Sequence, residues 1–357
     1  MVSVGDTIGV EEEFHVVHAE TGELEMAARQ VLRGADAEPE LHRSMVETAS
    51  SVQTGLEGLR ADLLEKRRSL VEATGRLGLA IVAAGSVPGS GSTPSQVYPD
   101  ERYERMAQEY RQLVDEQQVA ACQVQIGVPD RDLAVRITRR IREWLPTLLA
   151  LSVSSPYFAG HDTGYASYRT IVTSRWPTVG PPPDLGSAAE YEKVVATLVE
   201  SGVISDAGMV YFDARPSARY PTVEVRVADS CPRIDDVVLL AALSRALVTR
   251  AAEEDAAGRP LPEAPQVLLR AATWRAARYG IGGHLVDPAT RAAVPAAERI
   301  DALMAHARPA LEARGEWGVA TELLAGLRAR GTSAARQRAA GSHREVVLAL
   351  AKETTGD

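Results

Sequence analysis

The sequence predicts an α+β protein that combines strands carrying polar residues on one face with amphipathic helices. Two observations lead to this prediction. Short runs of β-branched residues alternate with charged or amide side chains, which is typical of strands with one polar face. Elsewhere, leucine and alanine recur at three- and four-residue steps, which is typical of amphipathic helices. We expect residues 1–357 to form a single domain that is mostly helical from about residue 234.

Residues 7–17, T-I-G-V-E-E-E-F-H-V-V, form the first predicted strand. Because side chains alternate faces along a strand, Glu11 and Glu13 point one way and Glu12 the other. Two carboxylates about 7 Å apart on one strand face repel each other, and burying them is costly without a cation. Magnesium takes oxygen ligands and is usually shared between one or two carboxylates and substrate phosphates. The alternative is an edge strand with three solvated glutamates.

Residues 39–51 predict a second, short strand in which Glu47 is a third inward carboxylate; the alternative is an exposed glutamate before a helix. The leucine spacing over 54–78 predicts that helix. The apolar run 79–84 predicts a buried strand. The Gly- and Ser-rich residues 85–94 then form a loop that either cradles phosphate or simply lines a cleft.

A helix predicted over 103–121 leads into a strand that begins at residue 121. Gln123 and Gln125 share one face of this strand. Because a buried amide needs partners for both its oxygen and its N–H groups, this polar row either faces ligands or faces water. The spacing of leucine and isoleucine over 130–151 predicts one further helix.

Residues 152–170 combine aromatic, histidine, aspartate and arginine side chains without a clear period, which is typical of a functional loop. Its Arg169 is either an anion ligand or a partner in a surface salt bridge. Residues 209–228 predict two strands around a turn. Glu224 and Arg226 share a face of the second strand, where they would suit magnesium and a triphosphate oxygen. The alternative is an internal ion pair on an exposed sheet face.

The remaining helices follow from alanine and leucine periodicity. They are predicted over 190–201, 234–257, 265–279, 295–313, 317–329 and 333–352. Arg275 lies on the third of these and is a candidate nucleotide ligand.

Composition narrows the class of function. A net charge of −9 disfavours a nucleic-acid partner, and no apolar run reaches the roughly 18 residues that a membrane span needs. No signal peptide is visible. Cys122 and Cys231 are not in a C-x-x-C pair, which favours a reducing compartment over a disulfide scaffold or a cysteine zinc site. We therefore expect a cytoplasmic protein.

If the predicted strands pair in one sheet, the inward-pointing charged side chains are too numerous to lie together by chance. Several of the carboxylates could then hold two or three magnesium ions, which would neutralise the phosphates of ATP. Walker, kinase and G-x-G-x-x-G motifs are missing from the sequence, which disfavours the usual nucleotide-binding folds. The residues concerned are Glu11, Glu13, Glu47, Glu224, Arg226 and Arg169.

Taken together, these motifs resemble those of the carboxylate–amine ligases of the glutamate–cysteine ligase type 2 family, the YbdK-like group. The matching motifs run in order over nearly the full length. They are G-V-E-E-E-F-H at 9–15, V-E-T-A at 46–49, I-G-V-P-D-R-D-L-A-V-R at 126–136, W-L-P-T-L-L-A-L-S at 144–152, D-T-G-Y-A-S-Y-R at 162–169, R-W-P-T-V-G-P-P-P at 175–183, R-Y-P-T-V-E-V-R-V-A-D at 219–229, W-R-A-A-R-Y-G at 274–280 and G-T-S-A-A-R-Q-R at 331–338.

The resemblance implies a curved antiparallel sheet forming a funnel, with helices outside it, as in the glutamine synthetase-like superfamily. It also implies an ATP-dependent ligase that joins a carboxylate, typically that of a glutamate side chain, to an amine through an acyl phosphate. The implied metal ligands fall on Glu11, Glu13, Glu47 and Glu224, the positions that strand alternation selects. Arg226 and Arg169 fall on phosphate- or substrate-binding arginines, and the implied partners are small-molecule acids and amines. A homodimer is a reasonable expectation.

One stretch departs from the family. Its members commonly carry an H-V-H-V-G-like run where this chain has Gln123, Val124, Gln125, Ile126 and Gly127. An amide positions a substrate but is a weaker metal ligand than imidazole and cannot act as a base. One metal position or the usual amine is therefore in question. Two alternative functions follow: a phosphotransferase of the same superfamily, and a nucleotide-binding homologue without turnover.

Overall fold

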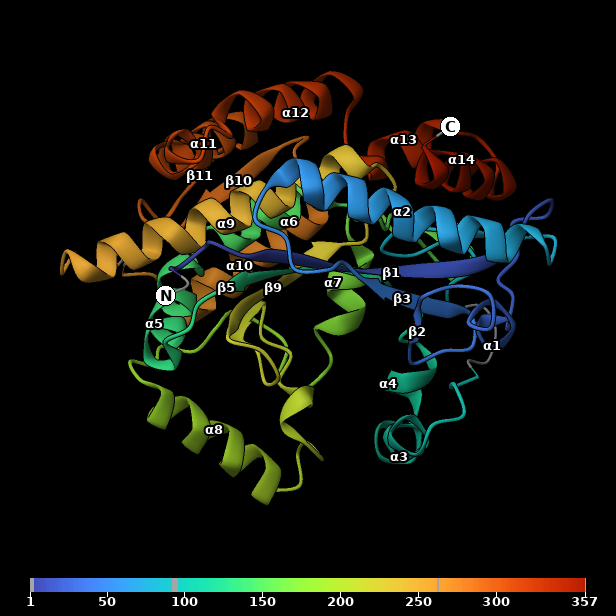
Figure 1. Cartoon of the computed structure of the whole chain (residues 1–357), viewed down its shortest axis with the longest axis horizontal. Coiled ribbons are helices and arrows are strands. Elements are labelled where there is room, and N and C mark those ends of the chain that lie inside the picture. Colours follow the sequence, from blue (N-terminus) through green and yellow to red (C-terminus); the bar gives the residue numbers. More distant parts are fainter. Residues whose placement is uncertain (1–2, 92–95, 262, 357) are drawn as a thin grey trace.

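The computed structural model describes residues 3–91, 96–261 and 263–356, and within them a seven-stranded antiparallel sheet crosses the middle of the molecule (Figure 1). Neighbouring strands run in the order β2–β3–β1–β5–β9–β8. Strand β4 pairs with β1 on the same side as β5, but further along β1. The predicted α+β class is confirmed. The strands are β1 (Ile8–His18), β2 (Glu38–Pro39), β3 (Met45–Ala49), β4 (Leu79–Val82), β5 (Ala121–Gly127), β8 (Ala214–Pro216) and β9 (Thr222–Asp229).

Most helices pack on one face of this sheet, drawn above it in Figure 1. Ile8 and Val10 of β1 point into this layer and share a buried cluster with Leu59 and Leu63 of α2. Burial of such side chains contributes about 25 cal/mol per Å² of apolar surface, so the alternation of apolar residues along β1 fixes which face is covered. The helices are α2 (Leu56–Gly75), α6 (Leu145–Ser152), α9 (Ile234–Ala256), α10 (Gln266–Tyr279), α11 (Ala296–Ala313), α12 (Trp317–Arg330), α13 (Ser333–Ala339) and α14 (His343–Thr355).

A buried ion pair lies within this helical layer. Glu12, the glutamate predicted to point away from its neighbours, accepts hydrogen bonds from Nη2 and Nε of Arg67 on α2 at 2.5 and 3.2 Å. Arg67 also donates to the carbonyl oxygens of Cys231 at 2.8 Å and Thr354 at 3.2 Å. Both charges are almost completely buried, so the pair joins the first strand to α2 and to two distant segments.

The opposite face of the sheet is flanked rather than covered. In Figure 1, α3 and α4 lie below one side of the sheet and α8 below the other. The short helix α7 follows the loop after α6. The bounds are α1 (Ala28–Val31), α3 (Glu101–Tyr110), α4 (Gln112–Asp115), α5 (Arg131–Ile141), α7 (Tyr168–Thr173), α8 (Ala188–Glu200) and the 3₁₀ turn at Ala207–Met209. Of the helices that the structure describes, none has the length and apolar content needed to cross a membrane.

Three predicted helices are shorter than expected. The helix predicted over 103–121 stops at residue 115, and Arg111 divides it with a φ of 51°. The helix predicted over 130–151 breaks at 142–144, because Pro146 lies in the first turn of α6 and cannot donate the bond that would continue the helix from α5. The helix predicted over 333–352 divides where Ser342 caps α14 with a capping box.

Four short strands outside the main sheet were not predicted. The pair β10 (His284–Asp287) and β11 (Ala292–Pro295) interrupts the helical C-terminal part, and β6 (Tyr157–Phe158) pairs with β7 (His161–Asp162) inside the loop after α6. Both hairpins are too short to show a clear alternation of apolar and polar residues.

Candidate active site

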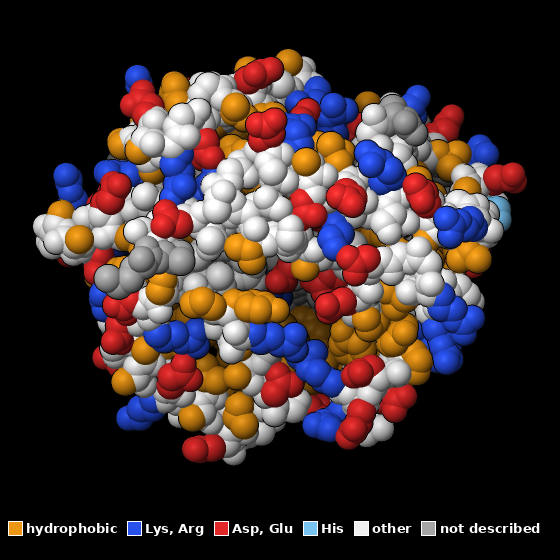
Figure 2. Space-filling model, viewed as in Figure 1, with side chains coloured by type: hydrophobic (Ala, Val, Ile, Leu, Met, Phe, Trp, Pro, Cys, Tyr) orange, Lys and Arg blue, Asp and Glu red, His pale blue; other side chains and the backbone are white. Residues whose placement is uncertain are grey.

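A cavity of about 700 Å³ opens on the polar face of the sheet. Strand β1 contributes Glu11 and Glu13 to its floor, while α3, α7 and α10 contribute to its walls. Figure 2 shows the corresponding hollow below the middle of the molecule, with acidic side chains above it and basic side chains along its lower rim. Cavities of this size hold small-molecule substrates.

Strand register places the predicted polar residues on this face. In the β1–β3 ladder Glu13 lies opposite Glu47, and in the β1–β5 ladder Glu11 lies opposite Gln123. Residues opposite each other in an antiparallel pair share one face of the sheet. All three inward carboxylates therefore meet in one region of the cavity, which the sequence could suggest only if these strands were neighbours.

The acidic end of the cavity is electrostatically strained. Burial, together with the charges of neighbouring carboxylates, raises the pKa of Glu47 well above its usual range, and burial also raises the pKa values of Glu11 and Glu13. Glu40 belongs to the same group, since burial and the charge of Glu13 raise its pKa to about 7. We did not predict Glu40, because alternation along the single strand predicted over 39–51 places it on the face opposite Glu47, whereas the chain forms two separate strands, β2 and β3, with Glu40 between them.

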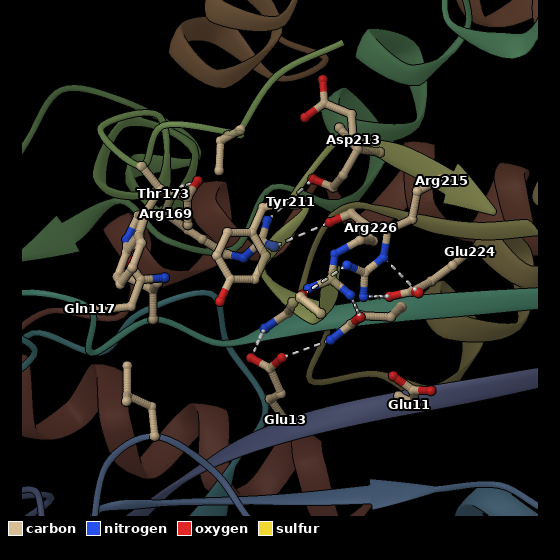
Figure 3. Close-up of a pocket in the computed structure, with 18 of the residues that line it drawn as sticks. Glu11, Glu13, Gln117, Arg169, Thr173, Tyr211, Asp213, Arg215, Glu224 and Arg226 are labelled. Atoms are coloured by element: carbon tan, nitrogen blue, oxygen red, sulfur yellow. Dashed lines mark hydrogen bonds and ion pairs between the residues drawn. The ribbon is translucent and has the colours of Figure 1, made fainter. Parts of the chain in front are cut away.

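The other end of the cavity is dominated by arginine. Glu224 lies opposite Gln125 in the β5–β9 ladder and accepts bonds from both Arg215 and Arg226 (Figure 3). Burial alone would raise the pKa of Glu224, but the charges of Arg226 and Arg215 outweigh it and lower the pKa to about 2. Arg215 was missed in the sequence. It lies directly opposite Glu224 in the β8–β9 ladder, and Nε donates to that carboxylate at 3.1 Å.

The two glutamines connect the acidic and basic ends. The side-chain oxygen of Gln123 accepts from Arg226, and its amide nitrogen donates to Glu13 at 3.0 Å. Gln125 accepts from the hydroxyl of Thr222 at 2.6 Å and donates to Glu11 at 3.1 Å. Both glutamines line the cavity. The amide orientation is therefore fixed, because each oxygen already has a donor and each nitrogen must turn toward a carboxylate.

Arg169 lines the cavity but is already held by the protein. Its guanidinium donates to the carbonyl oxygens of Val227 at 3.3 Å and Arg226 at 3.2 Å. It also lies 3.7 Å from Asp229, a buried carboxylate that accepts from Ser155 and Ser167. Arg169 thus lies at the cavity wall with its orientation set by strand β9.

Arg275 does not line the cavity. Its Nε donates to the carbonyl oxygen of His284 at 2.8 Å, and its guanidinium lies 5.2 Å from the ring centre of Tyr279. Helix α10 turns the neighbouring Trp274 toward the cavity instead. The prediction that Arg275 contacts a nucleotide therefore has no support in this geometry. Residues 85–91 of the Gly- and Ser-rich loop also lie outside the cavity lining, whereas residues 92–95 lie outside the described part of the chain.

The donor chemistry of the acidic end suits magnesium, but the carboxylates do not converge on a ready-made metal centre. Within residues 3–91, 96–261 and 263–356, no three His, Cys, Asp or Glu side chains lie close enough to hold an ion together. Glu11, Glu13 and Glu47 nevertheless offer oxygen ligands. Burial raises the pKa of each, and neighbouring carboxylates raise the pKa values of Glu11 and Glu47 further. Glu224 differs, since both of its oxygens accept from arginine.

Comparison with known proteins gives a match over nearly the whole chain. Residues 7–352 match the family model described as glutamate-cysteine ligase family 2. A protein of Frankia casuarinae that bears the provisional name glutamate–cysteine ligase 2-2 is 47% identical over 347 residues, which cover 96% of this chain and 40% of that protein. A protein of Mycolicibacterium smegmatis with the same provisional name is 46% identical, covering 96% of this chain and 87% of that protein.

The chain spans less than half the length of the first curated relatives that it matches. Among solved structures, the glutamate–cysteine ligase of Francisella tularensis in complex with AMP aligns with a TM-score of 0.71. That alignment covers 99% of this chain and 89% of the other at 10% identity, so it demonstrates a shared fold.

Proposed function

This chain belongs to glutamate-cysteine ligase family 2, and from that premise we propose that it uses ATP to join a carboxylate to an amine through an acyl phosphate. The observation that carries the proposal is the division of one cavity into an acidic end and an arginine end on a single sheet face. Phosphoryl transfer depends mainly on positioning and on neutralising charge, and this cavity offers groups for both.

Glu11, Glu13, Glu40 and Glu47 would hold Mg²⁺ at the acidic end. When bound, the ion would neutralise phosphate charge and orient the phosphates of ATP. The sequence analysis also assigned Glu224 to the metal ligands, and that assignment stays a prediction. The oxygens of Glu224 already accept hydrogen bonds from Arg215 and Arg226. In this geometry we propose that Glu224 instead orients Arg226.

Arg226 would stabilise the phosphoryl group during transfer. Its Nη1 contacts Gln123 and Glu224, while Nε and Nη2 make no hydrogen bond with the described residues and are available to an anion. The substrate carboxylate attacks the γ-phosphorus and ADP leaves. The amine then forms the C–N bond as the C–O bond to phosphate breaks. Arg169, held against β9, would position the acid.

The test is ADP release with ATP and Mg²⁺, first with single amino acids and then with acid–amine pairs. Release that requires both an acid and an amine, yields their amide and disappears in Glu224→Ala would support the ligase. Asp184→Asn is the matched control, because Asp184 pairs with Arg139 and Arg142 outside the cavity lining. Release with one substrate alone would indicate a phosphotransferase. Nucleotide binding without release would indicate a non-catalytic homologue.

The identities of the acid and the amine are separate questions. Glutamate and cysteine are the first pair to test, because the family and its relatives carry those names. A cytoplasmic location and a homodimer stay predictions from the sequence.

A further inference from the structure

The carboxylate of Asp213 has neither a partner among the described residues nor a place in the proposed metal site. Asp213 lines the cavity and is 8% exposed, yet its carboxylate makes no hydrogen bond or ion pair with the described residues, and Oδ2 is fully enclosed. The buried carboxylates Glu224, Glu13 and Asp229 each accept hydrogen bonds from the protein. A buried acid without partners costs stability, so its presence in a cavity suggests a role toward a ligand.

The backbone fixes the position of Asp213 firmly. It precedes β8, and its carbonyl oxygen accepts from the backbone N–H of Arg226 at 2.9 Å, while its own N–H donates to Gly180 at 2.8 Å. It therefore lies opposite Arg226 on the cavity face of the sheet. Figure 3 shows Arg226 and Arg169 between Asp213 and the glutamates Glu11 and Glu13. The free carboxylate is thus on the far side of the arginines from the proposed phosphate end.

There is room for a ligand beside it. Gly180 has a φ of 142°, a conformation that favours glycine, and no atom lies within 4 Å of the position that a Cβ would take there. Gly180 lines the same cavity. Arg169 on α7 is the charged group that most affects Asp213 electrostatically, and Arg215 and Arg226 are its charged neighbours on the strands. Within the described part of the chain, Asp213 is thus a cavity-lining carboxylate that can accept from a cationic ligand.

We propose that Asp213 binds the ammonium form of the acceptor amine and removes the proton that blocks its attack, which makes it a catalytic residue of the reaction proposed above. The carboxylate takes one proton from R–NH₃⁺ and becomes a carboxylic acid. The freed lone pair forms the C–N bond to the acyl carbon, and the C–O bond to phosphate breaks with its electron pair on the phosphate. The second proton lost by nitrogen passes to that phosphate.

The acidity of Asp213 suits this role. Burial raises its pKa to about 7, against a smaller opposing effect of Arg169. A general base is most effective when its pKa lies near the working pH. Near neutral pH a substantial fraction of Asp213 is ionised and able to accept a proton.

The test compares two nucleophiles in Asp213→Asn. Hydroxylamine is neutral at neutral pH and needs no deprotonation before attack, whereas an ordinary amino acid amine is an ammonium ion. We expect hydroxamate formation to stay within about threefold of wild type, while amide formation falls by about 10²–10⁴, the usual contribution of a general base. The rise of kcat/KM for the amine through pH 7 should also disappear.

Equal loss with both nucleophiles, or no loss with either, would overturn the assignment. Asp213→Glu, which keeps the acid, should recover part of the amide formation and leave hydroxamate formation unchanged. Failure to recover any amide formation would count against a base. A normally folded Asp213→Asn whose pH profile of kcat/KM matches that of wild type would also count against a base. If wild-type protein forms no hydroxamate with any acid, the proposed ligase function fails instead, so the two failures are distinguishable.

Discussion

Glu13 and Glu47 lie directly opposite each other in the β1–β3 ladder, so one cross-strand pair contains two carboxylates. Like charges in this relationship destabilise a sheet. From this shared position on the cavity face we predict that a cation binds there and that the acidic end responds to magnesium and to pH.

Removing one charge of this pair should have opposite effects with and without magnesium. Glu47→Gln should stabilise the metal-free protein by up to about 1 kcal/mol, because the cross-strand repulsion disappears. It should also lose most of the stabilisation that Mg²⁺ gives wild type, about 2.7 kcal/mol at an ion concentration 100 times Kd. Denaturant unfolding with and without Mg²⁺ measures both, with the exposed Glu65→Gln as control. A Mg²⁺ response as large as that of wild type would contradict this ligand assignment.

The stability of the metal-free protein should depend on pH through Glu40. Its pKa is raised to about 7 in the folded state from an ordinary value of 4.5. A raised folded pKa contributes stability that is fully present below pH 4.5 and is lost as the pH rises through about 7. Wild type should therefore lose stability relative to Glu40→Gln between pH 5 and pH 8. Unfolding curves at several pH values test this, and parallel curves for the two proteins would show that Glu40 does not titrate as described.

Arg226 should be sensitive even to a conservative change. Lysine keeps the charge but cannot contact Gln123, Glu224 and a phosphate together, since it lacks the planar fork of arginine. Arg226→Lys should lower kcat by about 10²–10³, the usual effect of losing one group that stabilises developing charge. Arg219→Lys, at the exposed rim of the cavity, is the comparison. Near-normal kcat in Arg226→Lys would remove Arg226 from the proposed chemistry.

The Glu12–Arg67 pair should matter for folding rather than for the reaction. Arg67→Met leaves a buried carboxylate without its partner and should destabilise the protein by about 3–5 kcal/mol. The double variant Glu12→Gln with Arg67→Met should recover part of that loss, because no buried charge is left unpaired. Chemical unfolding of both, beside the exposed Arg68→Met, gives the answer. A loss for Arg67→Met no larger than for Arg68→Met would mean that this pair does not stabilise the fold.

Strand alternation was enough to predict which glutamates point inward, because it depends only on local geometry. Glu11 and Glu13 line the cavity, and Glu12 points into the helical layer, as expected. Which strands are neighbours had to be assumed, because strand pairing depends on residues far apart in the chain. In the structure, Glu47 lies opposite Glu13 and Gln123 lies opposite Glu11.

The residues that sequence reasoning missed lie at or beside short strands. Asp213 and Arg215 alternate with Phe212 and Ala214 in the strand predicted before the turn, but only Ala214–Pro216 of it forms a strand. Glu40 lies just after β2, where the strand predicted over 39–51 is interrupted. Pairing with neighbouring strands, which the sequence does not give, brings these residues to the cavity. Arg275, in contrast, was predicted to contact a nucleotide from its place on a helix, but its side chain donates to the backbone of β10.

The most direct test of an acyl phosphate is to follow oxygen from the acid. The substrate acid is labelled with ¹⁸O in both carboxylate oxygens and supplied with ATP, Mg²⁺ and the amine, and the phosphate released is examined by mass spectrometry. Attack of the carboxylate on the γ-phosphorus predicts one ¹⁸O in each phosphate and one in each amide. Amide formed alongside unlabelled phosphate would contradict the account, because the acid would then have been activated without forming a bond to phosphorus.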